Sequence, residues 1–391
     1  MRRFGPASGT FGGGGRFPVL DRLNRPKAGT WGWGLRRRRR RAGKEGDGAA
    51  TASDRWFRPL RSPALSPWRV VRIPGTGRQH RGGPVDRRSG PRPLILDGGL
   101  GTELQRRGRS VTAPWWTAHC LRDADGRRLI AQIHAEYVTA GADVITADTF
   151  RTTPRATHRA GIAGDTVAAG LVRTAVALAR EAADTVRRRV LVAGSVAPVE
   201  DCYRPDLVPH DGVLRREHAW LAERLARTSV DLVLVETMNT AREAVAATRA
   251  VCAEGLPAWV SFVCTDDARL LSGTDVVAAA TAVRAAGADM VLVNCTDPAG
   301  TDGALRRLRR PDVGPLGAYP NLEDRSGLPT AAAVDRYLPP RLTPDAFAEL
   351  CTGWSYLDVV GGCCGSTPAH IAALRGRFPV DDRGVRPRET G

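Results

Sequence analysis

The sequence has no run of about 18 uncharged apolar residues, which is what a helix needs in order to cross a membrane. Arginines stand near the N-terminus, but no apolar stretch with a small-residue cleavage site follows them, so a secretory signal is not evident. No P-loop is present, and the glycines at 98, 99 and 101 do not fit the G-x-G-x-x-G pattern of dinucleotide sites. The seven histidines form no HExxH motif. These absences exclude a membrane span and the common nucleotide motifs, and we expect a cytoplasmic protein.

Lysine is also scarce, with two lysines against 56 arginines, and the positive charge is unevenly placed. Residues 1–92 hold 23 Lys/Arg and 5 Asp/Glu, whereas the remaining residues hold 35 Lys/Arg and 36 Asp/Glu. The net charge of +17 therefore belongs to the first segment. We expect no nucleic-acid partner for the rest of the chain.

The basic segment 1–92 is rich in Arg, Gly and Pro and shows neither helical nor strand periodicity, so we expect it to be disordered. One interpretation is a tail that binds nucleic acid or a membrane surface. Another is translation from a start codon placed too far upstream in a GC-rich coding sequence, and on this interpretation the native protein begins near Val85. We predict three parts: this leader, a folded domain over 93–378, and a flexible C-terminal tail over 379–391.

From Pro93 onward, short apolar runs alternate with longer segments of helical spacing. The runs are continuously apolar, as strands covered on both faces are. The eight predicted strands are Leu94–Asp97, Val144–Ala147, Val190–Ala193, Leu232–Glu236, Trp259–Cys264, Met290–Asn294, Leu316–Tyr319 and Leu357–Val360. The predicted helices are 127–140, 166–186, 216–228, 241–254, 275–286, 302–310 and 344–352. Eight such alternations predict an α/β fold, a (β/α)8 TIM barrel, and a doubly wound sheet is the alternative.

A TIM barrel carries its active site at the C-terminal ends of its strands, and reactive residues collect there in this sequence. Cys295 follows the sixth predicted strand, and Cys363 and Cys364 follow the eighth. Three thiolates would leave the fourth tetrahedral position of a zinc ion open, as in catalytic sites. The glycines at 361, 362 and 365 would let the backbone turn so that both adjacent sulfurs reach one metal. Buried structural cysteines or a vicinal disulfide are the alternatives that the residues alone leave open.

The other cysteines carry less information. Because disulfide frameworks are typical of small secreted domains, we expect free thiols instead. Cys202 and Cys264 could line the pocket, and the remaining three are expected on helices or in loops, namely Cys120, Cys252 and Cys351. We expect His134 and His218 to be surface or packing residues.

Two carboxylates also stand at strand ends. Glu236 could hold a substrate ammonium group, or it could be a charge at the N-terminus of the following helix. Asp97 precedes Gly98 and Gly99, where Asp is also common in ordinary turns.

With these residues assembled, the chain resembles the homocysteine S-methyltransferase family. The matching text is LDGGLGTELQRRG at 96–108, ADTFRTTP at 147–154, ETMNTAREA at 236–244, NCTDP at 294–298, AYPN at 318–321 and GGCCGSTPAHI at 361–371. The resemblance implies a Zn²⁺-dependent barrel that methylates homocysteine to methionine. It also implies that Cys295, Cys363 and Cys364 are the zinc ligands and that the substrate-binding residues are Asp97, Gly98, Gly99, Glu236 and Asn294.

The implied chemistry follows from the ionisation of a thiol. A free thiol has a pKa of about 8.5, and binding to zinc removes its proton. The thiolate would then attack the methyl group of a cationic donor such as S-methylmethionine or S-adenosylmethionine, with no catalytic residue of the protein needed beyond the metal site. The partners are thus a small thiol acceptor and a methyl donor.

The sequence departs from the family pattern in two places. Asp148 stands where the family often has Asn, and residues 197–203 replace a loop that is often of Gly-Pro-Tyr-Gly type. Both changes are expected to add negative charge near the barrel mouth. Three alternatives therefore stay open: the same chemistry on another thiol or selenol, a nucleic-acid-binding protein that uses its Arg-rich leader, and a barrel without catalytic activity.

Overall fold

The computed structural model describes residues 92–162, 164–328 and 335–379. The predicted leader and C-terminal tail lie outside these residues, apart from the leader's last residue and the tail's first. The eight strands are all parallel and are β1 (Leu94–Ile95), β2 (Val144–Ala147), β3 (Leu191–Val196), β4 (Leu232–Met238), β5 (Ala258–Phe262), β6 (Met290–Asn294), β7 (Leu316–Tyr319) and β8 (Val359–Val360).

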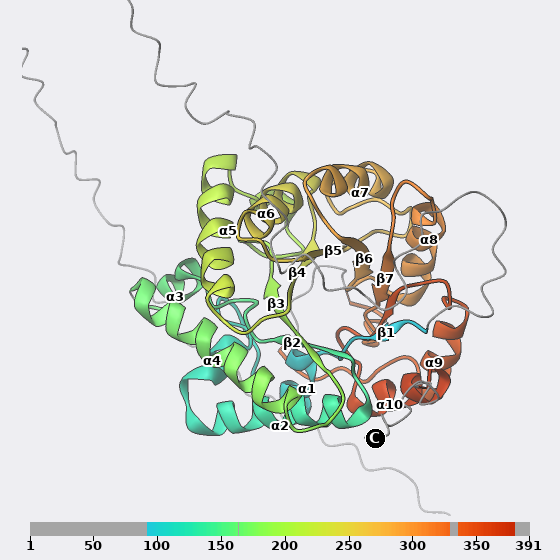
Figure 1. The fold of residues 1–391 in the computed structure, drawn as a ribbon, viewed down its shortest axis with the longest axis horizontal. Helices are drawn as coiled ribbons and strands as arrows, with labels where there is room; N and C mark the ends of the chain where they lie inside the picture. Colours follow the sequence, from blue (N-terminus) through green and yellow to red (C-terminus); the bar gives the residue numbers. More distant parts are fainter. Residues whose placement is uncertain (1–91, 163, 329–334, 380–391) are drawn as a thin grey trace, which may run out of the picture. The chain divides into compact units, whose positions relative to one another are not determined.

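The sheet closes on itself. Its order is β1-β8-β7-β6-β5-β4-β3-β2, and a parallel bridge between Leu96 and Val144 joins the two ends. The backbone N–H of Asp143 donates to Ile95 across this seam at 2.6 Å. Figure 1 shows the strands inside a ring of helices. The predicted (β/α)8 barrel is confirmed, and the doubly wound alternative is wrong.

Alternation along the strands divides the core into two parts. In β4, Val233 and Val235 face outward and pack in the large cluster shared with the helices, whereas Leu232 and Leu234 face the barrel interior. The interior cluster contains other side chains from nearly every strand, namely Leu96, Val144, Leu191, Ala193, Trp259, Met290, Leu292, Tyr319 and Val359. The barrel is therefore filled by side chains, and the space for chemistry lies at its C-terminal mouth.

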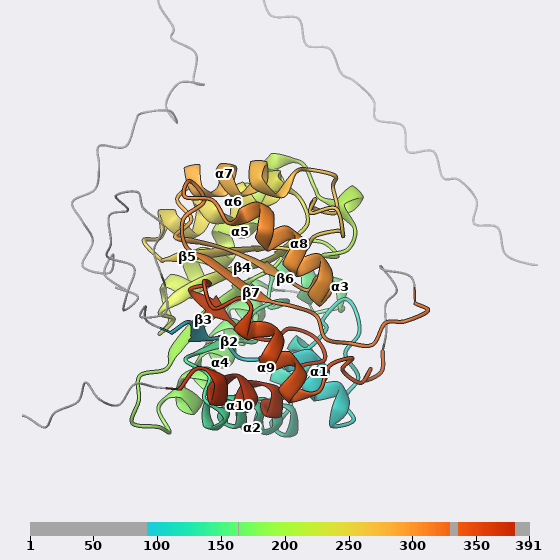
Figure 2. The ribbon, with the colours of Figure 1, turned by 90° about the vertical axis from the view of Figure 1, so that its right-hand side faces the viewer.

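The helices that follow the strands are α1 (Leu100–Arg106), α2 (Ala124–Ala140), α3 (Pro154–Arg159), α4 (Asp165–Ala183), α5 (Asp211–Ala226), α6 (Ala241–Ala253), α7 (Val276–Ala285), α8 (Pro298–Leu308), α9 (Pro344–Thr352) and α10 (Pro368–Arg377). Two 3-10 turns, η4 (Ala118–Arg122) and η5 (Pro205–Leu207), lie in loops. Helix α10 contacts both α9 and α2, and Figure 2 shows these neighbours from the side.

Two helices begin several residues before their predicted starts. Helix α8 begins at Pro298 and not at 302, because Asp297 accepts hydrogen bonds from the backbone N–H groups of Ala299 and Gly300. Proline at the first helical position suits this cap, since its missing N–H would have no partner in the helix anyway. Helix α5 begins at Asp211 and not at 216, although the side chain of its N-cap residue, His210, makes no capping hydrogen bond.

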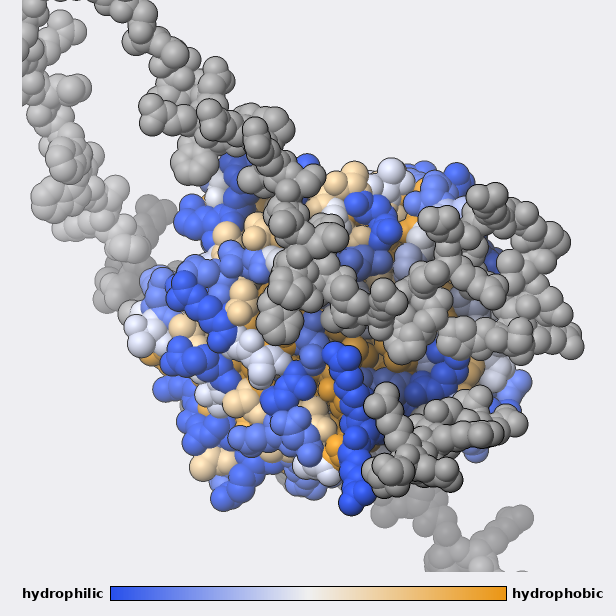
Figure 3. Space-filling view, in the orientation of Figure 1, coloured by the Kyte–Doolittle hydropathy of each residue, from blue (hydrophilic) through white to orange (hydrophobic). Residues whose placement is uncertain are grey.

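The outer surface is mainly polar. Figure 3 shows one face on which hydrophilic side chains cover the outer helices. Among the described residues, the large hydrophobic side chains that are exposed are Val167 and Leu207. No helix in the described part of the chain is both long and apolar enough to cross a membrane. The two histidines that were expected on the surface or in packing, His134 and His218, are both buried.

Candidate metal and substrate site

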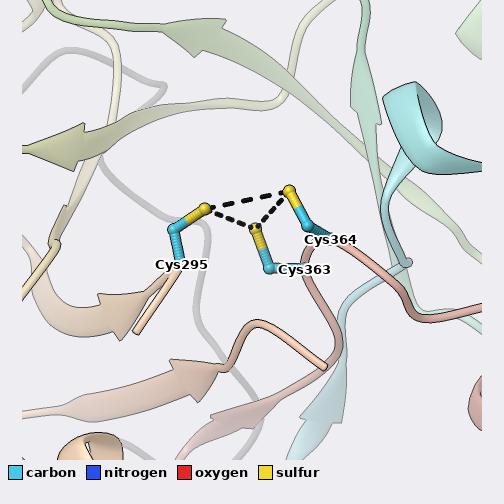
Figure 4. A group of neighbouring side chains, drawn as sticks. All are labelled: Cys295, Cys363 and Cys364. Carbon is cyan, nitrogen blue, oxygen red and sulfur yellow. Dashed lines mark hydrogen bonds between the residues drawn. The ribbon is translucent and has the colours of Figure 1, made fainter. Parts of the chain in front are cut away.

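Three cysteine sulfurs meet at the C-terminal mouth of the barrel (Figure 4). The Sγ atom of Cys295 lies 3.5 Å from that of Cys363 and 3.8 Å from that of Cys364, and the last two are 4.0 Å apart. Within the described residues, this is the cluster of metal-ligating side chains close enough to share one ion. The structure therefore brings together the three residues that the sequence placed after two different strands.

The spacing of the sulfurs fits a tetrahedral metal ion. With zinc–sulfur bonds of about 2.3 Å and tetrahedral angles, two sulfurs on one zinc lie about 3.8 Å apart. The three observed separations, 3.5, 3.8 and 4.0 Å, scatter around that value. A disulfide needs sulfurs about 2.05 Å apart. None of the eight cysteines forms a disulfide, so the alternative of a vicinal disulfide is wrong.

The backbone at both cysteine positions is unusual. Cys295 has φ of 49°, in the left-handed region that residues other than glycine seldom adopt. In the second segment, the N–H of Cys363 donates to the carbonyl of Pro320, and the carbonyl of Cys364 accepts from Leu322. Gly365 adopts φ of 78° directly after them. These constraints turn the two adjacent sulfurs toward the same point, as the flanking glycines suggested.

The three thiols share hydrogen bonds. Donation from Cys363 and Cys364 holds the pKa of Cys295 well below the usual thiol range. The same contacts with Cys295 raise the pKa of Cys363 and of Cys364. One sulfur of the cluster therefore carries negative charge readily, which suits it to bind a cation.

A tyrosine that the sequence reasoning missed completes one side of this cluster. The Oη atom of Tyr203 lies 3.2 Å from the Sγ atom of Cys295. Tyr203 belongs to the loop after β3, one of the two places where the sequence departs from the family pattern. The sequence shows a tyrosine in this loop, but it does not show that the side chain points toward Cys295.

Buried polar groups hold the Tyr203 loop in place. The guanidinium group of Arg151 donates to the carbonyls of Pro198 and Glu200 at 2.5 and 2.7 Å. Asn239 donates to the carbonyls of Asp201 and Cys202, and Glu243 accepts from the N–H of Val199. The loop thus presents the Tyr203 hydroxyl at a fixed position.

The predicted substrate carboxylates lie on neighbouring parts of the mouth. Asp97 is buried and accepts from the N–H and the hydroxyl of Thr146 at 2.7 and 3.0 Å. Glu236 is partly buried and accepts from the hydroxyl groups of Ser195 and Tyr319. Burial raises the pKa of both Asp97 and Glu236 to about 7. A bound cation would favour their ionised forms, so both groups are suited to meet an ammonium group.

The helix-terminus alternative for Glu236 does not hold. Glu236 lies within β4, whereas α6 begins at Ala241 and is capped by Thr240. The acidic residue in the first turn of that helix is Glu243.

The glycines and Asn294 pack closely within the site. A Cβ atom on Gly98 would lie 2.6 Å from the hydroxyl oxygen atoms of Ser366 and Tyr137, and one on Gly99 would lie 2.7 Å from the carbonyl oxygen of Cys363. Asn294 is fully buried, and its amide is bonded to Thr237 and Ser261. Direct contact of Gly98, Gly99 and Asn294 with substrate stays a prediction.

Part of the negative charge expected at the mouth is paired with arginines. The carboxylate of Glu200 pairs with Arg155 at 2.8 Å and with Arg159 at 2.5 Å. Asp148 is buried and accepts from the hydroxyl of Thr117, and burial raises the pKa of Asp148 to about 7. Glu200 is thus paired with arginines of α3, and added negative charge at the mouth as a whole stays a prediction.

The other candidate cysteines are buried. Cys202 and Cys264 are 2% and 6% exposed, and burial raises the pKa of both thiols. Neither belongs to the three-sulfur cluster.

Known proteins resemble this chain over the whole barrel. The family model described as "Homocysteine S-methyltransferase" matches residues 94–378. "Homocysteine S-methyltransferase 4" of Zea mays is 30% identical over 326 residues, which cover 75% of this chain and 94% of that protein. "Selenocysteine methyltransferase" of Astragalus bisulcatus is 28% identical and covers 76% of this chain and 94% of that protein.

A solved structure agrees with the fold. The metallated form of the homocysteine methyltransferase MmuM from Escherichia coli superposes with a TM-score of 0.62 at 28% identity. The match covers 73% of this chain and 96% of that one.

Proposed function

This chain belongs to the homocysteine S-methyltransferase family, and on that premise we propose that it transfers a methyl group from a cationic donor to the thiol of homocysteine, with a zinc ion held by Cys295, Cys363 and Cys364. The observation that carries the proposal is the triangle of three sulfurs spaced as a tetrahedral zinc site requires. The existence of a metallated form of the Escherichia coli relative supports a bound metal.

The cysteines would hold the ion and leave one position of its tetrahedron for the acceptor. A bound zinc ion would supply one property, the ionisation of the acceptor thiol at neutral pH. Cys295 enters from the end of β6 and the other two from the end of β8, so the acceptor sulfur would be held at the C-terminal mouth of the barrel.

Asp97 and Glu236 would bind the ammonium group of the amino-acid acceptor. Each carboxylate already accepts hydrogen bonds that fix its orientation, two from Thr146 to Asp97 and one each from Ser195 and Tyr319 to Glu236. An ammonium group bound here would replace part of the solvation that burial has removed. Fixing both ends of the acceptor converts the reaction into one between positioned partners.

The methyl transfer itself is one displacement. The acceptor sulfur forms a bond to the donor's methyl carbon while the bond from that carbon to the donor's cationic sulfur breaks, and its electron pair stays on the donor sulfur. The donor leaves as a neutral thioether, and no proton moves in this step. We propose S-methylmethionine or S-adenosylmethionine as donor, and methionine is then the product.

A selenol acceptor is the second candidate. The observation in its favour is the similarity to a selenocysteine methyltransferase from Astragalus bisulcatus. Assays of the full chain with both donors, against homocysteine and selenocysteine, would separate the two. Absence of turnover by zinc-loaded protein with either donor would contradict the proposal, and faster turnover of selenocysteine would favour the second candidate.

We further propose that residues 93–378 carry this activity and that the basic segment 1–92 contributes nothing to it. All residues assigned here lie between Asp97 and Cys364. A chain that starts at Val85 should retain the full chain's kcat/KM, and a loss of activity would show that the leader takes part.

A further inference from the structure

Two residues at the mouth adopt left-handed backbone conformations without being glycine. Thr237 has φ of 57° and Cys295 has φ of 49°. This region is sparsely populated, and it is especially unfavourable for a β-branched residue such as threonine. Such conformations persist where the surroundings fix them, and they cluster at functional sites. Thr237 directly follows Glu236, and Cys295 directly follows Asn294.

The side chain of Asn294 binds Thr237 at two points. Its Nδ2 atom donates to the hydroxyl oxygen of Thr237 at 2.8 Å, and its Oδ1 atom accepts from the Thr237 backbone N–H at 3.1 Å. Asn294 is fully buried and Thr237 is 3% exposed. These two hydrogen bonds thus join the end of β4, at Thr237, to the end of β6, next to Cys295.

The hydrogen bonds continue from Asn294 to the carboxylate of Glu236. Ser261 of β5 donates to Asn294 Oδ1 at 2.9 Å, and its hydroxyl lies 2.6 Å from that of Tyr319 of β7. The Tyr319 hydroxyl lies 3.3 Å from Glu236 Oε2. We call Thr237, Ser261, Asn294 and Tyr319 the brace. The brace is buried and spans four consecutive strands, from the neighbour of Cys295 to Glu236.

We propose that the brace fixes the spacing between Cys295 and Glu236 and thereby selects the length of the amino-acid thiol that the site accepts. This inference rests on the proposed function, in which the metal at Cys295 takes the sulfur and Glu236 takes the ammonium group. A methylene group more or less moves the sulfur by more than 1 Å relative to the ammonium group, and misplacement by about 1 Å costs about 100-fold in rate. A rigid spacing therefore discriminates homocysteine from cysteine, whereas a loosened one does not.

Asn294, Thr237 and Ser261 act in this account as positioning residues. Asn294 Oδ1 already accepts two hydrogen bonds, and Ser261 makes its contacts within the brace. Their effect reaches substrate through Cys295 and Glu236. Asn294, which the sequence suggested as a substrate contact, is reassigned by this inference to holding the backbone.

The test uses the full chain with matched substitutions. Thr237→Val keeps the shape of the side chain and removes its hydroxyl, and Thr237→Ser keeps the hydroxyl as a rescue. Ser261→Ala interrupts the brace at a second point. Thr248→Val is the control, since Thr248 is equally buried and its hydroxyl bonds to the Ala244 carbonyl within α6. Circular dichroism establishes that each variant is folded.

Two binding measurements serve as readouts. Zinc affinity is measured by competition with a chelator, and affinities for homocysteine and cysteine are measured from the sulfur-to-metal absorption of cobalt-substituted protein. We expect Thr237→Val and Ser261→Ala to reduce the preference for homocysteine over cysteine by about tenfold or more, because one methylene in a binding pocket is worth about 10- to 200-fold. Thr237→Val should also weaken zinc binding, since Cys295 loses its fixed backbone. Thr237→Ser and Thr248→Val should behave as the wild type does.

The opposite results are equally clear. If Thr237→Val and Ser261→Ala keep the wild-type preference, or if Thr248→Val changes it as much, the brace does not set acceptor length. If the cobalt spectrum of the wild type responds to neither thiol, the proposed function fails. In that case zinc affinity still shows whether the brace fixes the backbone of Cys295. Thr237→Val should then bind zinc more weakly than Thr248→Val does. Equal zinc affinities would overturn this part of the inference.

Discussion

The hydroxyl of Tyr203 lies 3.2 Å from the sulfur of Cys295, although 92 residues separate them in the chain. The contact joins the loop after β3 to the end of β6 across the barrel mouth. The buried side chains of Arg151, Asn239 and Glu243 hold the loop. They therefore keep the Tyr203 hydroxyl beside the sulfur cluster.

Replacement of Tyr203 by Phe should weaken metal binding without abolishing it. A hydrogen bond to a charged group contributes about 1.5–3 kcal/mol, so we expect zinc affinity to fall by about 10- to 100-fold. Chelator competition measures the change. Tyr356→Phe is the control, because the ring of Tyr356 packs under Arg309 away from the cluster. Unchanged affinity in Tyr203→Phe would show that the contact has no role in the metal site.

Replacement of Glu236 by Gln should weaken binding of the acceptor's amino group. The loss of a charged hydrogen bond of about 1.5–3 kcal/mol predicts that the dissociation constant of homocysteine rises by about 10- to 100-fold. The matched ligand is 4-mercaptobutyrate, which is homocysteine without its amino group. Its affinity should not fall in the variant, and an equal loss for both ligands would place Glu236 at the sulfur end of the site instead.

Asp148 makes stability depend on pH in a direction opposite to that of most carboxylates. Burial raises its pKa from 3.8 to about 7, so the folded protein favours the neutral form. Below about pH 4 the folded and unfolded states are both protonated and Asp148 costs nothing. As the pH rises from about 4 to about 7 the unfolded state ionises first, and stability is lost. The ceiling on this loss is on the order of 4 kcal/mol.

Replacement of Asp148 by Asn removes this ionisation. The free energy of unfolding of the variant, measured with urea, should exceed that of the wild type above pH 7, and the difference should shrink toward pH 4. A difference that does not change with pH would mean that Asp148 is ionised in the fold as readily as in the unfolded chain.

Gly361 should tolerate no side chain. A Cβ atom there would lie 2.6 Å from Cβ of Leu96 and 3.0 Å from its carbonyl oxygen, just beyond the paired strands β8 and β1. Overpacking of this kind costs about 1–3 kcal/mol. Gly361→Ala should therefore lower the free energy of unfolding and displace the neighbouring cysteines. Gly376→Ala is the control, since nothing lies within 4 Å of its added Cβ atom. Equal stabilities of the two variants would contradict this packing.

Much of the fold follows from local sequence, because buried parallel strands are continuously apolar and the helices between them are amphipathic. The short helices were missed. Helix α3 has six residues, and the polar segment of α10 shows no clear apolar face. Their positions depend on the barrel against which they pack, and the local sequence pattern does not reveal these contacts.

Some residues of the site could be predicted from the sequence, and others could not. The three cysteines could be predicted because each follows a strand, and a barrel brings strand ends together. Tyr203 could not, since its position is set by Arg151, Asn239 and Glu243 from other parts of the chain. Ser261 lies in the middle of an ordinary apolar strand, and only the closed barrel places its hydroxyl beside Asn294 and Tyr319.

The zinc content of the purified, reduced full chain tests the central claim most directly. We predict about one zinc ion per chain in the wild type, and a content near zero after Cys295→Ala, Cys363→Ala or Cys364→Ala, with methyl transfer lost in parallel. Cys351→Ala is the control, because Cys351 is a buried free thiol of α9 outside the sulfur cluster. Zinc that remains bound when Cys364 is replaced, or a wild type that binds none, would contradict the account.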